Sequence, residues 1–327
     1  MKKIPDVSEL KNILILRGEG SLGDAILSSC MYREIKKANP AVKISVACFG
    51  GAYDYLAKNP YIDVLYRIPA RRVIRPNQRW LRLSWLGFKL RRKRFDFVLD
   101  FAIKNFYNWR FFKWLCGGDR VLDLQASPVP FVRREAPAKE CAKQVLELFI
   151  SSPVDASYEL SVSPQTAARV AGFVARNAPA GYILFNPFGS VGPRSLNREA
   201  FWYVSDFATR QSGLPVIIPC MSAQKAVVEA YLRDIPSPEG RKFIYQTADV
   251  FDLFALVRGA RLVITPDTAV VHVAAGFEKP TVAFYNSYFI YNSPNNPNAR
   301  VVKTDPSSVS VFVHDEFEKA FRSAVSL

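Results

Sequence analysis

Short apolar runs alternate with longer segments of helical period along the second half of the chain. The apolar runs are continuous, as in Val-Ile-Ile and Leu-Val-Ile, which is typical of strands that are covered on both faces. The sequence predicts strands at 182–185, 215–219, 242–245, 262–265 and 281–284, and helices at 198–211, 223–232, 250–257 and 270–275. Strands and helices in turn indicate a parallel sheet with helical crossovers.

The first half of the chain repeats this pattern. Strands are predicted at 13–16, 43–48, 64–66, 97–99 and 120–123, with a helix at 25–38. Ser, Pro and Asp cluster at 151–155, before a helical segment that begins near Pro164, so the linker is expected at 151–163. We therefore predict two Rossmann-like α/β domains, 1–157 and 158–327. Ligands of such sheets bind beyond the carboxyl ends of the strands, so the loops there are the candidate sites.

Composition narrows the class of protein. The chain has 327 residues, of which 49% are hydrophobic and 22% charged, and this excludes a mainly disordered protein. No apolar run reaches the roughly 18 residues of a membrane-spanning helix, and the start of the chain does not fit a signal peptide, so we expect a cytoplasmic protein. The five cysteines are odd in number and never spaced as Cys-x-x-Cys. They are expected to be buried, reduced thiols.

The glycine-rich loop 18–24 follows the first predicted strand. Its glycines and the helix N-terminus after it can bring backbone N–H groups close to an anion or a sugar. No Gly-Lys-Ser or Gly-Lys-Thr follows, so it is not a Walker A loop. Asp24 lies in the first helical turn, where the helix dipole favours an ionised carboxylate that can take a proton from a hydroxyl. The alternative is that Asp24 only caps its helix.

Segment 265–272 follows another buried strand and begins a helix. Thr268 and His272 are four residues apart and therefore share one helical face. A helix N-terminus at this place can bind a diphosphate through its N–H groups, with the Thr268 hydroxyl as a further donor. Asp267 would need a ligand hydroxyl or its own backbone as a partner. The alternative for His272 is a satisfied core residue.

The loop 186–194 is rich in Gly and Pro and follows the strand predicted at 182–185. Its small residues allow close approach, and Arg194 can complement a phosphate. The alternative is a mobile surface loop.

A basic stretch runs from Arg67 to Arg94, with eleven positive charges and no Asp or Glu. It accounts for most of the net charge of +15, which predicts anionic partners. Tryptophan, leucine and phenylalanine are interleaved, which suits an anionic lipid headgroup or a membrane interface. Nucleic acid is the rival partner, and a solvated face is the third interpretation. The candidate residues for binding an anionic acceptor or another anion are Arg71, Arg72, Arg75, Arg91, Arg92, Lys93 and Arg94.

Taken together, these segments resemble glycosyltransferase family 9, the lipopolysaccharide heptosyltransferases. One part of the resemblance is Ile-Leu-Ile-Leu-Arg at 13–17 with Ser-Leu-Gly-Asp at 21–24. The other is Asp-Thr-x-x-x-His-x-Ala-Ala-x-x-x-Lys-Pro-Thr at 267–281, which is the more specific motif. The order and separation of the motifs fit across nearly the whole chain.

The resemblance implies a GT-B fold, with two Rossmann-like domains facing each other across a cleft. The first would bind the acceptor and the second a nucleotide sugar, and the last helix would pack back on the first domain. Heptose would be transferred from ADP-heptose, with inversion, to an anionic lipopolysaccharide core of the Kdo, heptose and lipid A type. Asp24 matches the general base, and Ser21, Leu22 and Gly23 form the glycine loop beside it. The residues that match the donor site are Gly189, Ser190, Arg194, Asp267, Thr268, Ala269 and His272.

No metal or other cofactor is expected, because helix N-termini and a basic side chain can take the charge of the leaving diphosphate. Three departures from the family pattern lie around the donor. Arg194-Ser195-Leu196 stands where Lys, one residue and Trp are usual, so a planar fork replaces a point donor. Ala269 and Asn286 stand where Gly is usual.

The leading interpretation is therefore a cytoplasmic glycosyltransferase, peripherally associated with the inner membrane, whose partners are a nucleotide sugar and an anionic glycolipid. Two alternatives remain open at this point. One is a transferase of the same fold that uses another nucleotide sugar or a protein acceptor. The other is a catalytically idle module that binds an anionic glycolipid, and the retention of Asp24 with the donor residues argues against it. Nucleic acid is the least favoured partner.

Overall fold

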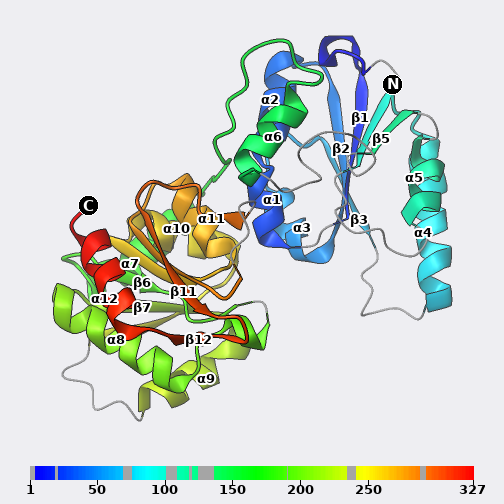
Figure 1. Ribbon diagram of the computed structural model, residues 1–327. Coiled ribbons are helices and arrows are strands. Elements are labelled where there is room, and N and C mark those ends of the chain that lie inside the picture. Colours follow the sequence, from blue (N-terminus) through cyan, green and yellow to red (C-terminus); the bar gives the residue numbers. More distant parts are fainter. Residues whose placement is uncertain are drawn as a thin grey trace. The chain divides into compact units, whose positions relative to one another are not determined.

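The computed structural model describes residues 4–18, 21–68, 76–100, 109–117, 120–123, 136–189, 191–233, 241–287 and 292–327, with the backbone alone for 76–79 and for residue 123 (Figure 1). The chain divides into two compact units, Met1–Glu159 and Leu160–Leu327. The boundary expected from the sequence, after residue 157, lies just before this division. Each unit is an α/β domain built on its own sheet.

The first unit contains a parallel sheet of five strands in the order β3-β2-β1-β4-β5. The strands are β1 (Asn12–Arg17), β2 (Lys43–Phe49), β3 (Val64–Ile68), β4 (Phe97–Asp100) and β5 (Val121–Asp123), which confirms the five strands that the apolar runs predict. The chain moves from β1 to one side through β2 and β3, and then returns to the other side with β4. The carboxyl end of β1 therefore lies at a topological switch point, where open α/β sheets bind their ligands.

Helices cover both faces of this sheet (Figure 1). The helical elements are η1 (Val7–Glu9), α1 (Leu22–Leu27), α2 (Cys30–Ala38), α3 (Gly50–Leu56), α4 (Pro76–Arg91), α5 (Trp109–Gly117) and α6 (Ala138–Leu146). Helices α2 and α6 lie on one face. On the other face, Leu86 of α4 and Phe112 of α5 join Leu14, Leu16 and Val98 of the strands in one hydrophobic cluster.

The single helix predicted at 25–38 is wrong, because the structure has α1 and α2 separated at Ser28 and Ser29. The Asp24 carbonyl accepts hydrogen bonds from the Ser28 hydroxyl (3.0 Å) and from Arg17 Nη2 (2.8 Å). The Ser29 hydroxyl donates to the Ile26 carbonyl (2.7 Å). Serine side chains compete in this way with the helical backbone, and here a buried arginine assists them.

The second unit contains a sheet of seven strands in the order β12-β11-β10-β9-β6-β7-β8. The strands are β6 (Ile183–Phe185), β7 (Val216–Cys220), β8 (Lys242–Gln246), β9 (Leu262–Pro266), β10 (Thr281–Tyr285), β11 (Ala299–Asp305) and β12 (Ser308–Phe312). The pattern of apolar runs predicts the first five of these. Strand β12 alone is antiparallel to its neighbour among the pairings of this sheet that the structure describes. The order reverses at β6, which has β7 on one side and β9 on the other.

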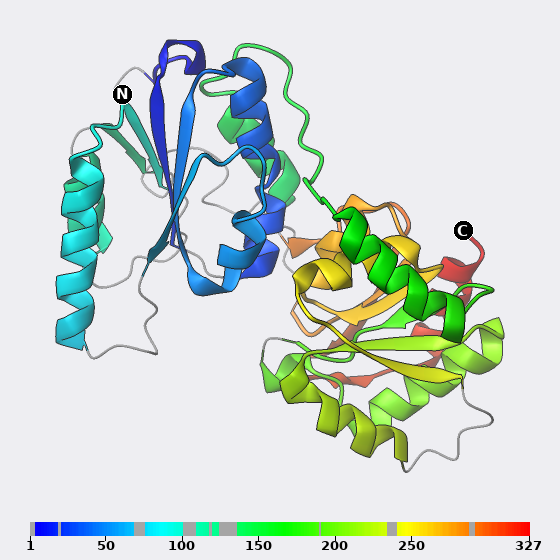
Figure 2. The same ribbon diagram turned by 180° about the vertical axis from the view of Figure 1, so that it is seen from behind.

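Two helical layers enclose the second sheet (Figure 2). The helical elements are α7 (Pro164–Asn177), η4 (Gly192–Arg194), α8 (Arg198–Ser212), α9 (Ser222–Arg233), α10 (Val250–Gly259), α11 (Ala269–Gly276) and α12 (His314–Val325). The last helix, α12, buries Phe317 and Phe321 against Phe207 and Phe284. The apolar face of α12 therefore belongs to the core of the second unit, and the packing of this helix on the first domain stays a prediction.

All five cysteines are free and buried, as predicted. Burial raises the pKa of the Cys48 thiol to about 11, so this thiol stays protonated near neutral pH. Within the described residues, no helix combines the length and the apolar character that crossing a membrane requires.

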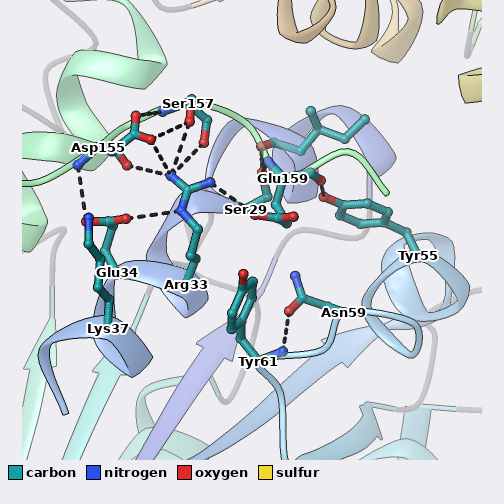
Figure 3. Close-up of polar contacts among 11 residues, drawn as sticks. Ser29, Arg33, Glu34, Lys37, Tyr55, Asn59, Tyr61, Asp155, Ser157 and Glu159 are labelled. Carbon is teal, nitrogen blue, oxygen red and sulfur yellow. Dashed lines mark hydrogen bonds and ion pairs between the residues drawn. The ribbon is translucent and has the colours of Figure 1, made fainter. Parts of the chain in front are cut away.

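The last residues of the first unit are tied to α2 (Figure 3). Arg33 donates to the carbonyls of Asp155 (2.8 Å) and Ser157 (3.2 Å) and to the carboxylate of Glu159 (3.0 Å). The Tyr55 hydroxyl donates to the Glu159 carbonyl at 2.6 Å. These contacts explain why the segment up to Glu159 belongs to the first unit.

Candidate active site

Two of the candidate segments meet at the switch point of the second sheet. Strands β6 and β9 are neighbours, with Phe185 paired to Ile264, although 79 residues separate these two in the sequence. The loop after β6 and the segment after β9 therefore leave the same edge of the sheet side by side. This is the place where a doubly wound sheet binds its ligand.

Asn186 joins these two segments. Its side-chain Nδ2 lies 3.0 Å from the Phe188 carbonyl, 3.0 Å from Thr265 Oγ1 and 3.4 Å from Thr268 Oγ1. The residue is only 8% exposed. The amide thus holds the start of its own loop against the end of β9 and the start of α11. Asn186 is not among the site residues predicted from the sequence. The signal that could have predicted it is a polar side chain directly after a buried strand.

Thr268 is the N-cap of α11, where its hydroxyl accepts a hydrogen bond from the Val270 N–H at 3.2 Å. The sequence analysis expected this hydroxyl to be a donor to a ligand. In the structure its first role is to satisfy one of the N–H groups that a helix start leaves without a partner. Ala269, the first residue of α11, follows it, and the backbone at this end of the helix carries partial positive charge.

Arg194 approaches Asp267, with its Nη1 atom 3.5 Å from Asp267 Oδ2. Asp267 is buried, whereas Arg194 is about one-third exposed, with a side-chain exposure of 32%. A guanidinium carries five N–H donors, and a single carboxylate does not use them all. The arrangement therefore offers an exposed, oriented cation beside the N-terminus of α11.

Gly189 allows this approach. A Cβ atom added to Gly189 would lie 2.4 Å from the Arg194 carbonyl oxygen, so no larger residue fits without a shift of the backbone. The Gly189 N–H donates to Ser195 Oγ at 3.0 Å, and the Leu196 N–H donates to the Pro187 carbonyl at 2.8 Å. The loop thus folds back on itself and carries Arg194 toward Asp267. Ser190, the remaining candidate of this loop, lies outside the described residues.

His272 lies one turn after Thr268 on α11 and is buried, with 4% of its surface exposed. This burial agrees with the core interpretation of this histidine. Its role in donor binding stays a prediction. The Lys-Pro-Thr end of the same motif begins β10 at the amino edge of the sheet, where the Thr281 hydroxyl donates to the Lys279 carbonyl at 2.8 Å.

The first unit presents Asp24 at the carboxyl end of β1, on the first turn of α1. Ser21, not Asp24, is the N-cap: its hydroxyl accepts from the Asp24 N–H at 3.1 Å and also donates to the Asp24 carboxylate. The turn Ser21-Leu22-Gly23-Asp24 thus holds a half-buried carboxylate whose capping task another residue performs. The buried side chain of Arg17 donates a hydrogen bond to the Asp24 carbonyl and so holds this turn in place. This role was not predicted from the sequence.

The basic candidates lie elsewhere. Arg91 ends α4, and residues 92–94 lead into β4, so they lie at the amino edge of the first sheet. Asp24 follows β1, which is parallel to β4, and therefore lies at the opposite, carboxyl edge. The structure thus separates Arg91, Arg92, Lys93 and Arg94 from Asp24. Arg71, Arg72 and Arg75 lie outside the described residues.

Comparisons with known proteins agree with this architecture. The family model described as glycosyltransferase family 9 (heptosyltransferase) matches residues 143–315. A putative lipopolysaccharide heptosyltransferase 4 of Escherichia coli K12 is 22% identical over 294 residues, which cover 86% of this chain and 76% of that protein.

Solved structures resemble the whole chain. A glycosyltransferase family 9 structure from Veillonella parvula has a TM-score of 0.78 at 17% identity and covers 98% of both chains. The E. coli heptosyltransferase WaaC with ADP has a TM-score of 0.65 at 16% identity, covering 96% of this chain and 99% of that one. These likenesses confirm the predicted GT-B fold class.

Proposed function

The chain belongs to glycosyltransferase family 9 and is a glycosyltransferase of the heptosyltransferase type, and from this premise we propose that its donor is ADP-heptose and its acceptor an anionic lipopolysaccharide core. The observation that carries the proposal is the pairing of Arg194 with Asp267 at the N-terminus of α11. It joins two segments that are distant in the sequence at the ligand-binding edge of the second sheet.

In this proposal the diphosphate of the donor binds at the start of α11. The backbone N–H of Ala269 and the guanidinium of Arg194 bind its negatively charged oxygens. Asp267 accepts a hydrogen bond from a hydroxyl of the nucleotide sugar or holds Arg194 in place. Gly189 and Ser190 contribute the loop, and Thr268 and His272 orient the helix start. These positive groups stabilise the departing diphosphate, so the proposal requires no metal or other cofactor.

We assign Asp24 the role of general base. It accepts the proton of an acceptor hydroxyl, whose oxygen attacks the anomeric carbon from the side opposite the diphosphate. The new C–O bond forms as the old one breaks, ADP leaves with the bonding electrons, and the anomeric configuration inverts. The hydrogen bond from the Ser21 hydroxyl orients the Asp24 carboxylate toward the acceptor hydroxyl.

The proposal also specifies heptose as the donor sugar and adenine as its base. The fork of Arg194 and the side chain of Ala269 stand in the donor site where the family usually has Lys and Gly, and both favour a second candidate with another nucleotide sugar. The acceptor is proposed to be a glycolipid, which requires a cytoplasmic enzyme peripherally associated with the inner membrane. Nucleic acid has no role in this proposal.

Calorimetry with ADP, UDP, GDP and CMP tests the donor first. The cognate nucleotide at 100 times its dissociation constant should also raise the unfolding free energy by about 2.7 kcal/mol. Preference for UDP, GDP or CMP over ADP would replace ADP-heptose by the second candidate.

Asp24→Asn tests the base. Transfer should fall by about 10²–10⁴-fold while donor affinity stays within a few-fold, because a base acts on the acceptor hydroxyl and not on the nucleotide. Ser21→Ala removes the helix cap and one hydrogen bond to Asp24 but leaves the carboxylate in place, so it should lower stability and reduce transfer far less than Asp24→Asn does. Full activity of the asparagine variant would leave Asp24 with a structural role only.

A further inference from the structure

Large aromatic side chains are exposed on one face of the first unit. The tryptophan and phenylalanine residues that the described part of the chain exposes all lie on α4 or α5: Trp80, Trp85, Phe88, Phe111 and Trp114, with exposures from 39% to 66%. Figures 1 and 2 show these two helices side by side on the same face of the sheet. Exposed aromatics gathered on one face indicate an interaction surface.

The rings form a continuous array across the two helices. Trp80 stacks on Phe111 with centroids 6.2 Å apart, and Phe111 stacks on Trp114 at 5.9 Å. Together with Trp85 and Phe88, the rings of Trp80 and Phe111 line a groove of about 630 Å³.

The groove is held in shape by the close crossing of α4 and α5. A Cβ atom on Gly87 would lie 2.9 Å from the Leu115 Cβ atom, so the crossing needs a glycine there. The apolar surface is thus built into the packing of the two helices.

Basic groups border the aromatic array. The guanidinium of Arg91 lies 5.3 Å from the centre of the Trp114 ring, and the ammonium of Lys89 lies 5.4 Å from that of Trp85. Such cation–π contacts place the charges beside the rings.

Next to Trp114, Arg91, Arg94 and Arg120 line a second cavity of about 440 Å³. Arg120 is fixed there because its Nη1 donates to the Phe95 carbonyl at 3.0 Å. Three guanidinium groups around one cavity form a site for a phosphate group.

Acidic groups are absent from this face in the described residues of α4 and α5, whose sequences contain neither Asp nor Glu. Asp100 of β4 is buried and pairs with Lys113 Nζ at 2.9 Å. The Asp96 carboxylate, next to Phe95, accepts hydrogen bonds from the Lys11 and Asn12 N–H groups. The α4–α5 face therefore combines an apolar groove, a cavity lined by three arginines and two helices whose charged residues are all basic. These are the properties of a surface that inserts at the boundary between headgroups and acyl chains of an anionic bilayer.

We propose that the α4–α5 face docks the enzyme on an anionic phospholipid bilayer, with the aromatic groove entering the interface and the arginine cavity holding a lipid phosphate. The inference rests on the proposed function only in that a glycolipid acceptor places the enzyme at a membrane. A single-stranded nucleic acid also stacks on aromatic rings. Its polar bases and sugars, however, gain little from contact with an apolar groove that contains Leu81, which is 62% exposed. An anionic bilayer accounts for both the aromatic groove and the arginine-lined cavity of this face.

Flotation with vesicles of phosphatidylethanolamine and phosphatidylglycerol, compared with phosphatidylcholine alone, tests the proposal on the full chain. The parent protein should bind the anionic vesicles, and binding should weaken as salt is raised. Arg91→Gln with Arg94→Gln should weaken binding about 25-fold, at about fivefold per charge near an anionic surface. Trp85→Gln with Phe88→Gln should weaken it about tenfold or more and leave most of the salt dependence in place.

Two matched controls lie on the second unit. Arg176→Gln with Arg233→Gln removes two exposed charges, and Met221→Gln with Val227→Gln removes two exposed apolar side chains. Both should bind vesicles as the parent does, and all variants should keep the parental circular dichroism and thermal midpoint. The inference is refuted if the parent binds both vesicle types equally weakly, or if the α4–α5 variants bind like the controls. It is also refuted if the parent prefers RNA or DNA to vesicles and the same variants lose that binding.

ADP affinity, measured on every variant, separates this inference from the proposed function. Affinity for ADP should be unchanged in the α4–α5 variants, because the donor residues belong to the second unit. Vesicle binding without any ADP binding would overturn the proposed donor and leave the docking surface intact. ADP binding without vesicle binding would overturn the docking surface and leave the proposed donor intact.

Discussion

Replacing Asn186 by Leu tests whether a single amide organises the proposed donor site. The substitution keeps the approximate shape of the side chain and removes its two N–H donors. The Phe188 carbonyl, 3.0 Å from Nδ2, then loses this donor beside a residue that is only 8% exposed, whereas Thr265 Oγ1 keeps its contacts with the Pro266 carbonyl and Thr268 Oγ1. Each buried polar atom left unsatisfied costs about 1–3 kcal/mol. The free energy of unfolding should therefore fall by about 1–3 kcal/mol.

The affinity for nucleotide should fall with it, because the loop that carries Arg194 is no longer fastened to the start of α11. We expect ADP to bind about tenfold more weakly, which corresponds to about 1.4 kcal/mol. Urea denaturation measures the first effect and calorimetry the second.

Asn177→Leu is the matched control, because Asn177 Nδ2 donates to the Phe173 carbonyl at 2.9 Å at the end of α7, away from both loops. It should lower stability modestly and leave ADP affinity unchanged. An Asn186→Leu protein that loses stability but binds ADP like the parent would show that the amide supports the fold and does not organise the site.

Two further predictions concern the donor site and the end of the first unit. Thr268→Val and His272→Ala should each weaken ADP binding by about 1–3 kcal/mol in calorimetry, and unchanged affinity in both would place the diphosphate elsewhere. Hydrogen bonds from the Ser157 N–H and hydroxyl, supported by the charge of Arg33, lower the pKa of Asp155 below its ordinary value of 3.8. The stability from this group is therefore complete above that pH and is lost as the pH falls through the lowered value, so Arg33→Gln should make urea-measured stability less sensitive to pH in the acid range. Equal acid sensitivity in parent and variant would exclude this role for Arg33.

The sequence predicts most clearly those strands that are buried at every position, because their apolar composition alone makes them recognisable. Strands β9 and β10 are buried at every position, so their residues are apolar almost without exception. Strand β11 is mostly half-exposed and carries Arg300, Lys303 and Asp305, which hides it from a search for apolar runs. The break between α1 and α2 was also hidden, because it depends on Arg17, which reaches the Asp24 carbonyl from the neighbouring strand.

The same distinction applies to the candidate site. Motif residues such as Asp24, Arg194 and Asp267 are recognisable because their chemistry and their places after strands can be read locally. Asn186 acts on Thr265, 79 positions away, and nothing in the local sequence shows that β6 and β9 are neighbours. Positioning residues of this kind become visible only once the strand order is known.

Strand order also changes the meaning of the basic stretch. In the sequence, Arg91 and its neighbours are one more set of cations available to an acceptor, and Asp24 is one more carboxylate. Because β1 and β4 are parallel, the turn that ends β1 and the segment that precedes β4 lie at opposite edges of one sheet. A cation at the amino edge lies far from the acceptor hydroxyl that the proposal places at Asp24, but it can hold a lipid surface while the carboxyl edge remains open to that acceptor. Membrane affinity and turnover are then separable by mutation. The Arg91 and Arg94 variants should lose rate on acceptor embedded in vesicles and keep it on acceptor dispersed in detergent, whereas Asp24→Asn should lose it on both.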